Sequence, residues 1–196
     1  MPVSGIVSRP RYDEPLMIDP AGQGHLVVAD HAFEPDAASF APVAPAAQVE
    51  LWTALGDSRV AAGSQRNDNL IARNYRSAAQ LLDALGHRLA RERVGLRVYA
   101  VGAEAFIWDV AALARKNGMD KSEYRLSRAG PERRRVYCVH CRTFTQDVTI
   151  NIVPCAGCGA HLAVRDHFSR RLAAFMGVQV DAETPGDIPS PVEAFS

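Results

Sequence analysis

The stretch Leu96-Arg-Val-Tyr-Ala-Val-Gly-Ala-Glu-Ala-Phe-Ile-Trp-Asp-Val110 joins a strand pattern to a helix pattern through a single glycine. Its first six residues are apolar with one exception, which predicts a buried strand over Leu96–Val101. After Gly102 the apolar residues recur at helical spacing, which predicts a helix over Ala103–Asn117. Because alternating strands and helices build parallel α/β sheets, this stretch decides the fold class of its part of the chain.

The same alternation continues on both sides of this stretch. The predicted elements are strands at Gly24–Asp30, Val49–Leu55 and Tyr124–Leu126, and a helix from Tyr75 to Arg93 with its leucines on one face. Residues 34–47 carry three prolines among alanines and are typical of a connector. We therefore expect an α/β fold with an abbreviated Rossmann-like parallel sheet of three or four strands, flanked by helices.

All four cysteines of the chain lie in two pairs toward its C-terminus, Cys138-Val-His-Cys141 and Cys155-Ala-Gly-Cys158. Each pair can form a tight turn that aims two sulfurs at one point. The intervening residues are numerous enough for a hairpin that brings the two turns together. This spacing predicts a tetrathiolate metal site of the zinc-ribbon type with Cys138, Cys141, Cys155 and Cys158 as its ligands. Four thiolates leave no open coordination position, so such a site is structural and cannot activate water.

Disulfides, an iron site and a site with a histidine ligand are the alternatives to a zinc site with four cysteines. Disulfides persist in secreted chains, but residues 1–20 lack the basic start and apolar core of a signal peptide, so we expect a cytoplasmic protein with reduced thiols. Iron in the same four thiolates would give a rubredoxin-like one-electron centre, yet the first pair lacks the Pro and Gly typical of that site. His140 and His161 could replace a sulfur, although four cysteines already complete the shell.

The chain is expected to divide into three parts. Residues 1–130 form the α/β domain with an extended N-terminal segment, and residues 131–178 form the zinc-ribbon or rubredoxin-like module. Within this module we expect a hairpin over Arg142–Ile152 and a final helix that begins at Asp166 and ends at Gly177. Residues 179–196 are rich in prolines and acids, which favours a flexible tail.

Composition and side-chain patterns narrow the function. The 22 basic residues balance 22 acidic ones, which argues against wholesale nucleic-acid binding, and no apolar run approaches the roughly 20 residues needed to cross a bilayer. Asp166, His167 and Ser169 lie too close together on one predicted helix to converge as a triad, so we predict no catalytic residues. Two basic stretches, Arg133–Arg135 and Arg165–Arg171, are candidate surfaces for an acidic partner.

The stretch Leu96–Val110 is similar to the last strand and helix of the nicotinamide-binding domain in ferredoxin-reductase-type flavoproteins. That family carries a Cys-Gly-Pro sequence between the two elements, whereas here Val101 and Ala103 flank the glycine. No glycine-rich phosphate loop follows an early strand, so we expect the fold without a nucleotide site and predict no cofactor-binding residues.

A second resemblance covers roughly residues 24–178. The segments Tyr137–Thr143 and Val164–Val178, above all Arg165-Asp-His-Phe-Ser-Arg-Arg171, resemble the small subunit of bacterial dimethylamine monooxygenase. The resemblance implies a hetero-oligomer with a haem-binding catalytic subunit and a flavin/iron–sulfur reductase subunit that carries FMN and a 2Fe–2S cluster. Such complexes demethylate secondary amines oxidatively with NADPH and O₂. The resemblance implies a non-catalytic accessory role for this chain. With iron in the four thiolates, the chain would alternatively relay electrons from the reductase to the haem.

Overall fold

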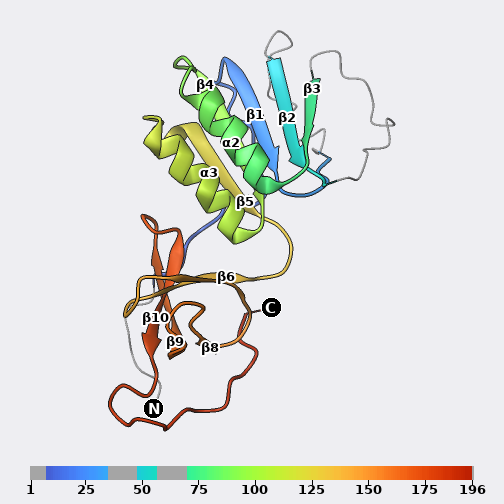
Figure 1. Ribbon diagram of the computed structural model, residues 1–196. Helices are drawn as coiled ribbons and strands as arrows, with labels where there is room; N and C mark the ends of the chain where they lie inside the picture. Colours follow the sequence, from blue (N-terminus) through green and yellow to red (C-terminus); the bar gives the residue numbers. More distant parts are fainter. Residues whose placement is uncertain (1–7, 35–47, 57–69, 196) are drawn as a thin grey trace. The chain divides into compact units, whose positions relative to one another are not determined.

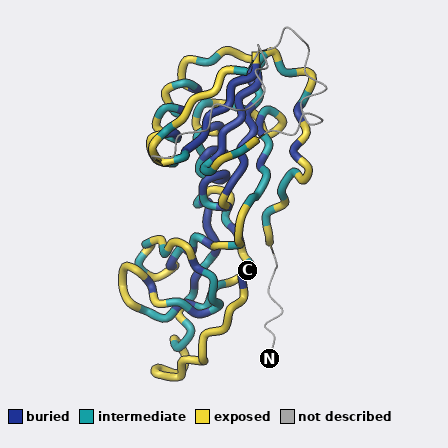
Figure 2. The backbone as a smooth tube through the Cα atoms, turned by 90° about the vertical axis from the view of Figure 1, so that its right-hand side faces the viewer, coloured by how far each residue is buried: buried dark blue, intermediate teal, exposed yellow. Residues whose placement is uncertain are grey.

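The computed structural model describes residues 8–34, 48–56 and 70–195 (Figure 1). The chain divides into two compact units. The first unit is Tyr12–Gly130, and the second begins at Pro131 and also includes residues 8–11. Each unit carries its buried residues mainly on its strands, as the dark-blue stretches of Figure 2 show. None of the described helices is long and apolar enough to cross a membrane.

A parallel five-stranded sheet forms the centre of the first unit, in the order β3-β2-β1-β4-β5. Its strands are β1 (Gly24–Ala29), β2 (Gln48–Ala54), β3 (Leu70–Tyr75), β4 (Leu96–Gly102) and β5 (Tyr124–Arg128). The predicted parallel α/β fold is therefore confirmed, with five strands instead of three or four. Strand β3 was missing from the prediction because most of its residues are exposed and its sequence lacks an apolar pattern.

Two helices cover one face of this sheet, α2 (Ala78–Leu89) and α3 (Glu104–Lys116), and a short 3₁₀ helix, η1 (Lys121–Glu123), precedes β5 (Figure 1). Helix α2 begins after Ser77, whose side chain accepts a hydrogen bond from the Gln80 backbone. The predicted start at Tyr75 was too early because the chain is still extended there. On the opposite face, Leu16 and Ile18 from the N-terminal segment pack against residues of β1, β2 and β4.

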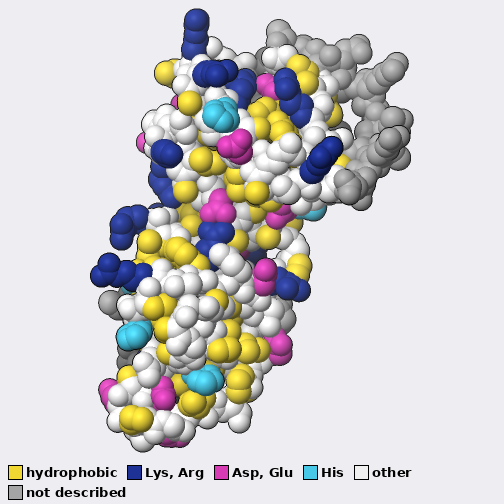
Figure 3. All heavy atoms as spheres, viewed as in Figure 1, with side chains coloured by type: hydrophobic (Ala, Val, Ile, Leu, Met, Phe, Trp, Pro, Cys, Tyr) yellow, Lys and Arg dark blue, Asp and Glu magenta, His cyan; other side chains and the backbone are white. Residues whose placement is uncertain are grey.

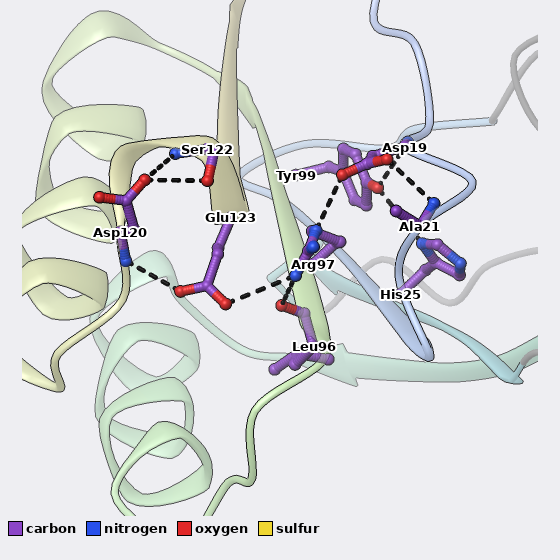
Figure 4. Close-up of polar contacts among 9 residues, drawn as sticks. All are labelled: Asp19, Ala21, His25, Leu96, Arg97, Tyr99, Asp120, Ser122 and Glu123. Carbon is purple, nitrogen blue, oxygen red and sulfur yellow. Dashed lines mark hydrogen bonds and ion pairs between the residues drawn. The ribbon is translucent and has the colours of Figure 1, made fainter.

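Polar contacts fasten this N-terminal segment to the amino ends of β1 and β4 (Figure 4). Arg97 Nε donates to Asp19 Oδ2 at 2.9 Å, and the Asp19 backbone N–H donates to Tyr99 Oη at 2.9 Å. His25 Nδ1 lies 3.2 Å from the same hydroxyl, and Arg97 also pairs with Glu123 of η1. Ligands of open α/β sheets bind at the opposite, carboxyl ends of the strands, so this cluster serves the fold.

The second unit contains a mixed five-stranded sheet in the order β7-β6-β10-β9-β8. Its strands are β6 (Arg134–Cys138), β7 (Phe144–Val148), β8 (Ile152–Pro154), β9 (His161–Ser169) and β10 (Ala174–Gln179). The single hairpin predicted over Arg142–Ile152 is wrong, because β7 pairs with β6 and β8 pairs with β9. Each cysteine pair therefore has a hairpin of its own.

The final helix predicted from Asp166 to Gly177 is also wrong, since these residues form the end of β9, a turn and most of β10. Phe168 and Phe175 are directly paired across the two strands, with ring centroids 5.0 Å apart. A spacing of seven residues also fits two helical turns, so the apolar pattern alone could not separate the two structures. Gly177 ends no helix but lets β10 approach β6, because a Cβ there would lie 2.6 Å from Val136 Cγ1.

A buried arginine, Arg134, contacts two carboxylates and two aromatic rings of the second unit. The Arg134 side chain is 1% exposed and donates to Asp166 Oδ1 at 2.8 Å and to Glu132 Oε1 at 3.1 Å. Its guanidinium carbon lies 4.0 Å from the ring centroid of Phe175 and 3.7 Å from that of Phe195. The Asp166 carboxyl loses solvation there, but hydrogen bonds from Arg9 and Arg134 outweigh this effect and hold its pKa below the ordinary value.

The end of the chain returns to this arginine. Phe195 is buried, and the backbone N–H groups of Ala194 and Phe195 donate to the Thr149 carbonyl at 3.1 and 3.0 Å. The expectation of a flexible tail over residues 179–196 therefore fails for its last residues. The proline and acid content of this segment agrees with the exposure of most of its residues, but Phe195 is buried in the second unit.

Replacing Phe195 with alanine should open the second unit locally. Loss of a buried aromatic side chain typically costs about 3 kcal/mol, and here it also uncovers one side of a buried guanidinium. We expect faster hydrogen–deuterium exchange in β6 and β10, measured by mass spectrometry on the full chain. Val192→Ala in the same segment, at an exposed position, is the matched control. Unchanged exchange in Phe195→Ala would contradict the anchoring role.

The burial of His25 makes the first unit sensitive to acid. Desolvation lowers the pKa of His25 below its ordinary value, so the folded state favours the neutral ring. Below about pH 6.5 the unfolded chain binds the extra proton first, and stability is lost as the pH falls. We expect the urea midpoint, followed by tryptophan fluorescence, to fall between pH 7.5 and 5. His25→Asn should flatten this dependence, whereas His87→Asn, at an exposed position, should keep it.

Candidate metal centre

The structure brings the four predicted ligands together. The Sγ atoms of Cys138, Cys141, Cys155 and Cys158 all lie within 4.8 Å of one another. The first pair lies in the β6–β7 hairpin and the second in the β8–β9 hairpin. None of the four forms a disulfide, and Cys138 and Cys155 are buried while Cys158 is exposed.

The sulfur separations fit a single tetrahedral ion. A metal–sulfur distance of about 2.3 Å requires sulfurs about 3.8 Å apart. Cys138 Sγ lies 4.0 Å from Cys158 Sγ, and Cys141 Sγ lies 3.5 Å from Cys155 Sγ. These four sulfurs could therefore hold one zinc or iron ion. His140 and His161 contribute no atom to this group.

The two hairpins present their cysteines with the same backbone pattern. The Arg142 N–H donates to the Cys138 carbonyl at 2.9 Å, and the Gly159 N–H donates to the Cys155 carbonyl at 3.0 Å. Both donors have left-handed backbone, with φ of 65° at Arg142 and 75° at Gly159. The fourth residue after each first cysteine must adopt this conformation to close the turn, and the second hairpin meets the requirement with glycine.

Thr143 links the two hairpins and is not among the residues predicted for the site. Its side chain and backbone donate hydrogen bonds to the Cys141 sulfur and lower the pKa of that thiol to about 6. A Cβ at Gly157 would lie 2.5 Å from Thr143 Oγ1, so the second turn needs glycine to accept this neighbour. The sequence signal that could have identified Thr143 is its position two residues after Cys141, together with the glycine inside the second cysteine pair.

The electrostatics of the cluster favour a bound cation. The Ala160 backbone donates a hydrogen bond that lowers the pKa of the Cys158 thiol, but desolvation and the three neighbouring thiols raise it to about 11. One thiolate therefore forms readily, whereas ionisation of a second is penalised. A divalent cation removes this penalty because it pairs with every negative sulfur at once.

The other polar groups singled out by sequence do not assemble into a site. Asp166 pairs with Arg9 and Arg134, Ser169 Oγ accepts a hydrogen bond from the Leu172 backbone, and His167 is exposed. Their positions on β9 and its turn differ from the helix assumed for them. Arg165 and Arg171 are exposed and stay a candidate docking surface.

The switch point of the parallel sheet is poorly suited to a phosphate. Between β1 and β4, Asp30 Oδ2 accepts a hydrogen bond from the Ala103 backbone at 3.0 Å, at the start of α3. A Cβ at Gly102 would lie 2.1 Å from Asp30 Oδ1, so the glycine makes room for this carboxylate. In dinucleotide-binding sheets a phosphate approaches such a helix start, and here a negative side chain repels it.

Metal content provides a direct test of the cysteine cluster. The purified chain should hold about one metal ion, because four thiolates form one complete shell. Cys138→Ser removes a buried ligand and should lower metal content, measured by plasma mass spectrometry, and speed hydrogen exchange in the second unit. His140→Ala lies in the same turn and should leave both unchanged. Full metal retention in Cys138→Ser would contradict the tetrathiolate assignment.

Comparison with solved structures gives only distant likenesses. Phthalate dioxygenase reductase covers 67% of this chain at 10% identity and a TM-score of 0.38, and the match spans 46% of that protein. Full-length CYP116B46 from Tepidiphilus thermophilus also covers 67%, at 15% identity and a TM-score of 0.35, over 19% of its length.

Comparison with known sequences is more informative. Residues 4–124 match the N-terminal domain, and residues 135–178 the C-terminal domain, of a family described as dimethylamine monooxygenase subunit DmmA-like. The haem-dependent oxidative N-demethylase delta subunit of Ectopseudomonas mendocina (strain ymp) is 40% identical over 123 residues, which are 63% of this chain and 70% of that protein. The resemblance seen in the sequence is confirmed: the chain belongs to the DmmA-like family of dimethylamine monooxygenase subunits.

Proposed function

We propose that this chain is a non-catalytic, metal-stabilised subunit of a haem-dependent complex that oxidatively demethylates dimethylamine or related secondary amines. Two observations support the proposal. Its relative from Ectopseudomonas mendocina is a delta subunit of a haem-dependent oxidative N-demethylase. The four clustered thiols can form a closed shell around an ion, which suits folding and not turnover.

The partners in this proposal are a haem-binding catalytic subunit and a reductase subunit with FMN and a 2Fe–2S cluster. NADPH and O₂ are the proposed cosubstrates, and the compartment is the cytoplasm, where the thiols stay reduced. The role left to this chain is assembly, because oxidative chemistry needs the redox groups of the partners. Its metal would hold the second unit folded and so preserve the surface that partners bind.

A second candidate function rests on the exposure of one ligand. Cys158 is exposed, so a metal bound here would have one sulfur at the surface. With iron in the site, such a sulfur would suit electron exchange between the reductase and the haem subunit. We favour zinc because the first cysteine pair, Cys138 to Cys141, lacks the Pro and Gly typical of rubredoxin-type turns.

Metal exchange separates these two functions. The chain is expressed with the proposed haem and reductase subunits, and formaldehyde release from dimethylamine is measured with NADPH. If the metal is structural, the zinc-loaded and the iron-loaded chain should support equal rates within about twofold, since neither ion takes part in turnover. Activity with iron alone, together with visible absorption that bleaches on reduction, would establish the electron relay instead. Complex formation is followed separately by light scattering.

A further inference from the structure

A basic groove lies on the first unit between α2 and the edge strand β3. It has a volume of about 530 Å³ and is lined by residues from β2, β3, α2 and the turn after α2. Trp52 comes from β2, and Ile71, Arg73 and Tyr75 come from β3. Arg88 comes from α2, and Arg91 lies in the turn that follows this helix. Figure 3 shows dark-blue basic side chains beside hydrophobic ones over this part of the molecule. None of these residues belongs to the metal centre.

The floor of the groove is apolar and held in place. Trp52 is 3% exposed, and its ring centroid lies 5.4 Å from that of Tyr75. The Arg73 guanidinium lies 5.8 Å from the Trp52 ring, which fixes its position over the aromatic floor. Ile71, next on the same face of β3, is 39% exposed. A ligand here therefore meets a preformed surface with alternating apolar and cationic side chains.

The charge of the groove is positive. Its lining contains three arginines and one carboxylate, Glu50. Glu50 is already occupied, because Arg88 Nη2 and Trp52 Nε1 each donate to it at 3.1 Å. Arg73 Nε also lies 3.8 Å from Glu50 Oε2, but the Arg73 side chain is 58% exposed, and Arg91 is exposed as well. In a chain whose formal net charge is zero, this surface favours a negatively charged ligand.

The backbone of β3 defines the shape of that ligand. Within the described residues β3 pairs only with β2, so the other side of β3 is the edge of the sheet. An edge strand offers N–H and C=O groups to an added strand, whose alternate side chains then point into the neighbouring groove. We propose that an extended acidic segment of a partner protein adds to β3 and places its side chains in this groove.

A second copy of this chain fits the same edge less well. Two β3 strands related by a two-fold axis would bring equivalent basic grooves together, and like charges oppose each other in such an interface. An acidic segment instead gains ion pairs with Arg73 and Arg91 and an apolar contact with Ile71. The proposal depends neither on the metal centre nor on the demethylase function.

A synthetic peptide tests this inference on the full chain. The probe is the capped peptide Thr-Glu-Thr-Leu-Thr-Glu-Thr with a fluorescent label, whose glutamates and leucine lie on one face when extended. We expect binding by anisotropy with a Kd on the order of 100 µM that weakens with salt. Arg73→Glu, at an exposed position, should weaken binding at least roughly tenfold, and Ile71→Asp should also weaken it. The control Lys116→Glu makes the same charge change on α3 and should bind like the wild type.

Three results would overturn the inference. The first is no binding of the acidic peptide, or equal binding of its lysine counterpart. The second is an equal loss of binding in Lys116→Glu. The third is a dimer of the wild-type chain, detected by sedimentation, that Arg73→Glu abolishes. A second copy of the chain, and not an acidic partner, would then occupy the groove. Thermal unfolding of each variant checks that the first unit is folded.

Discussion

Four sulfur atoms share a space less than 5 Å across, and this convergence governs the second unit. The sulfurs come from two separate hairpins at different places in one sheet, so the cluster exists only when β6, β7, β8 and β9 are all in place. Hydrogen bonding from Thr143 favours one thiolate, while crowding penalises the next. A cation relieves this repulsion, which couples ion binding to folding of the sheet.

The same unit also buries a positive charge, the guanidinium of Arg134, and protein groups alone compensate it. Arg134 needs no ion, because two carboxylates and two aromatic rings surround its guanidinium. One of those rings belongs to Phe195, so the end of the chain completes the site of a residue more than sixty positions earlier. Breaking one partner of a buried charge costs more than the pair contributes in total. The last residues are therefore part of the fold, although most residues of the tail are exposed.

Sequence reasoning recovered the parts of this structure that depend on local patterns. The strand and helix around Gly102 and the four clustered cysteines follow from periodicity and spacing, which a short window of sequence contains. The β9–β10 hairpin was mistaken for a helix because the pairing of Phe168 with Phe175 is decided by tertiary contacts. Strand β3 was missed because an exposed edge strand needs no apolar alternation. The role of Thr143 depends on contact with the opposite hairpin, which spacing does not encode.

Protein side chains make polar contacts at both ends of the parallel sheet. Asp30 occupies the start of α3 at the switch point, and Gly102 accommodates it. At the other ends of β1 and β4, Arg97 and Tyr99 fasten the N-terminal segment across the sheet. Both arrangements hold segments beside the sheet through hydrogen bonds from or to its strands and the start of α3. If the proposed acidic segment adds to β3, these contacts limit how far the sheet must reorganise on binding, and a smaller reorganisation favours affinity.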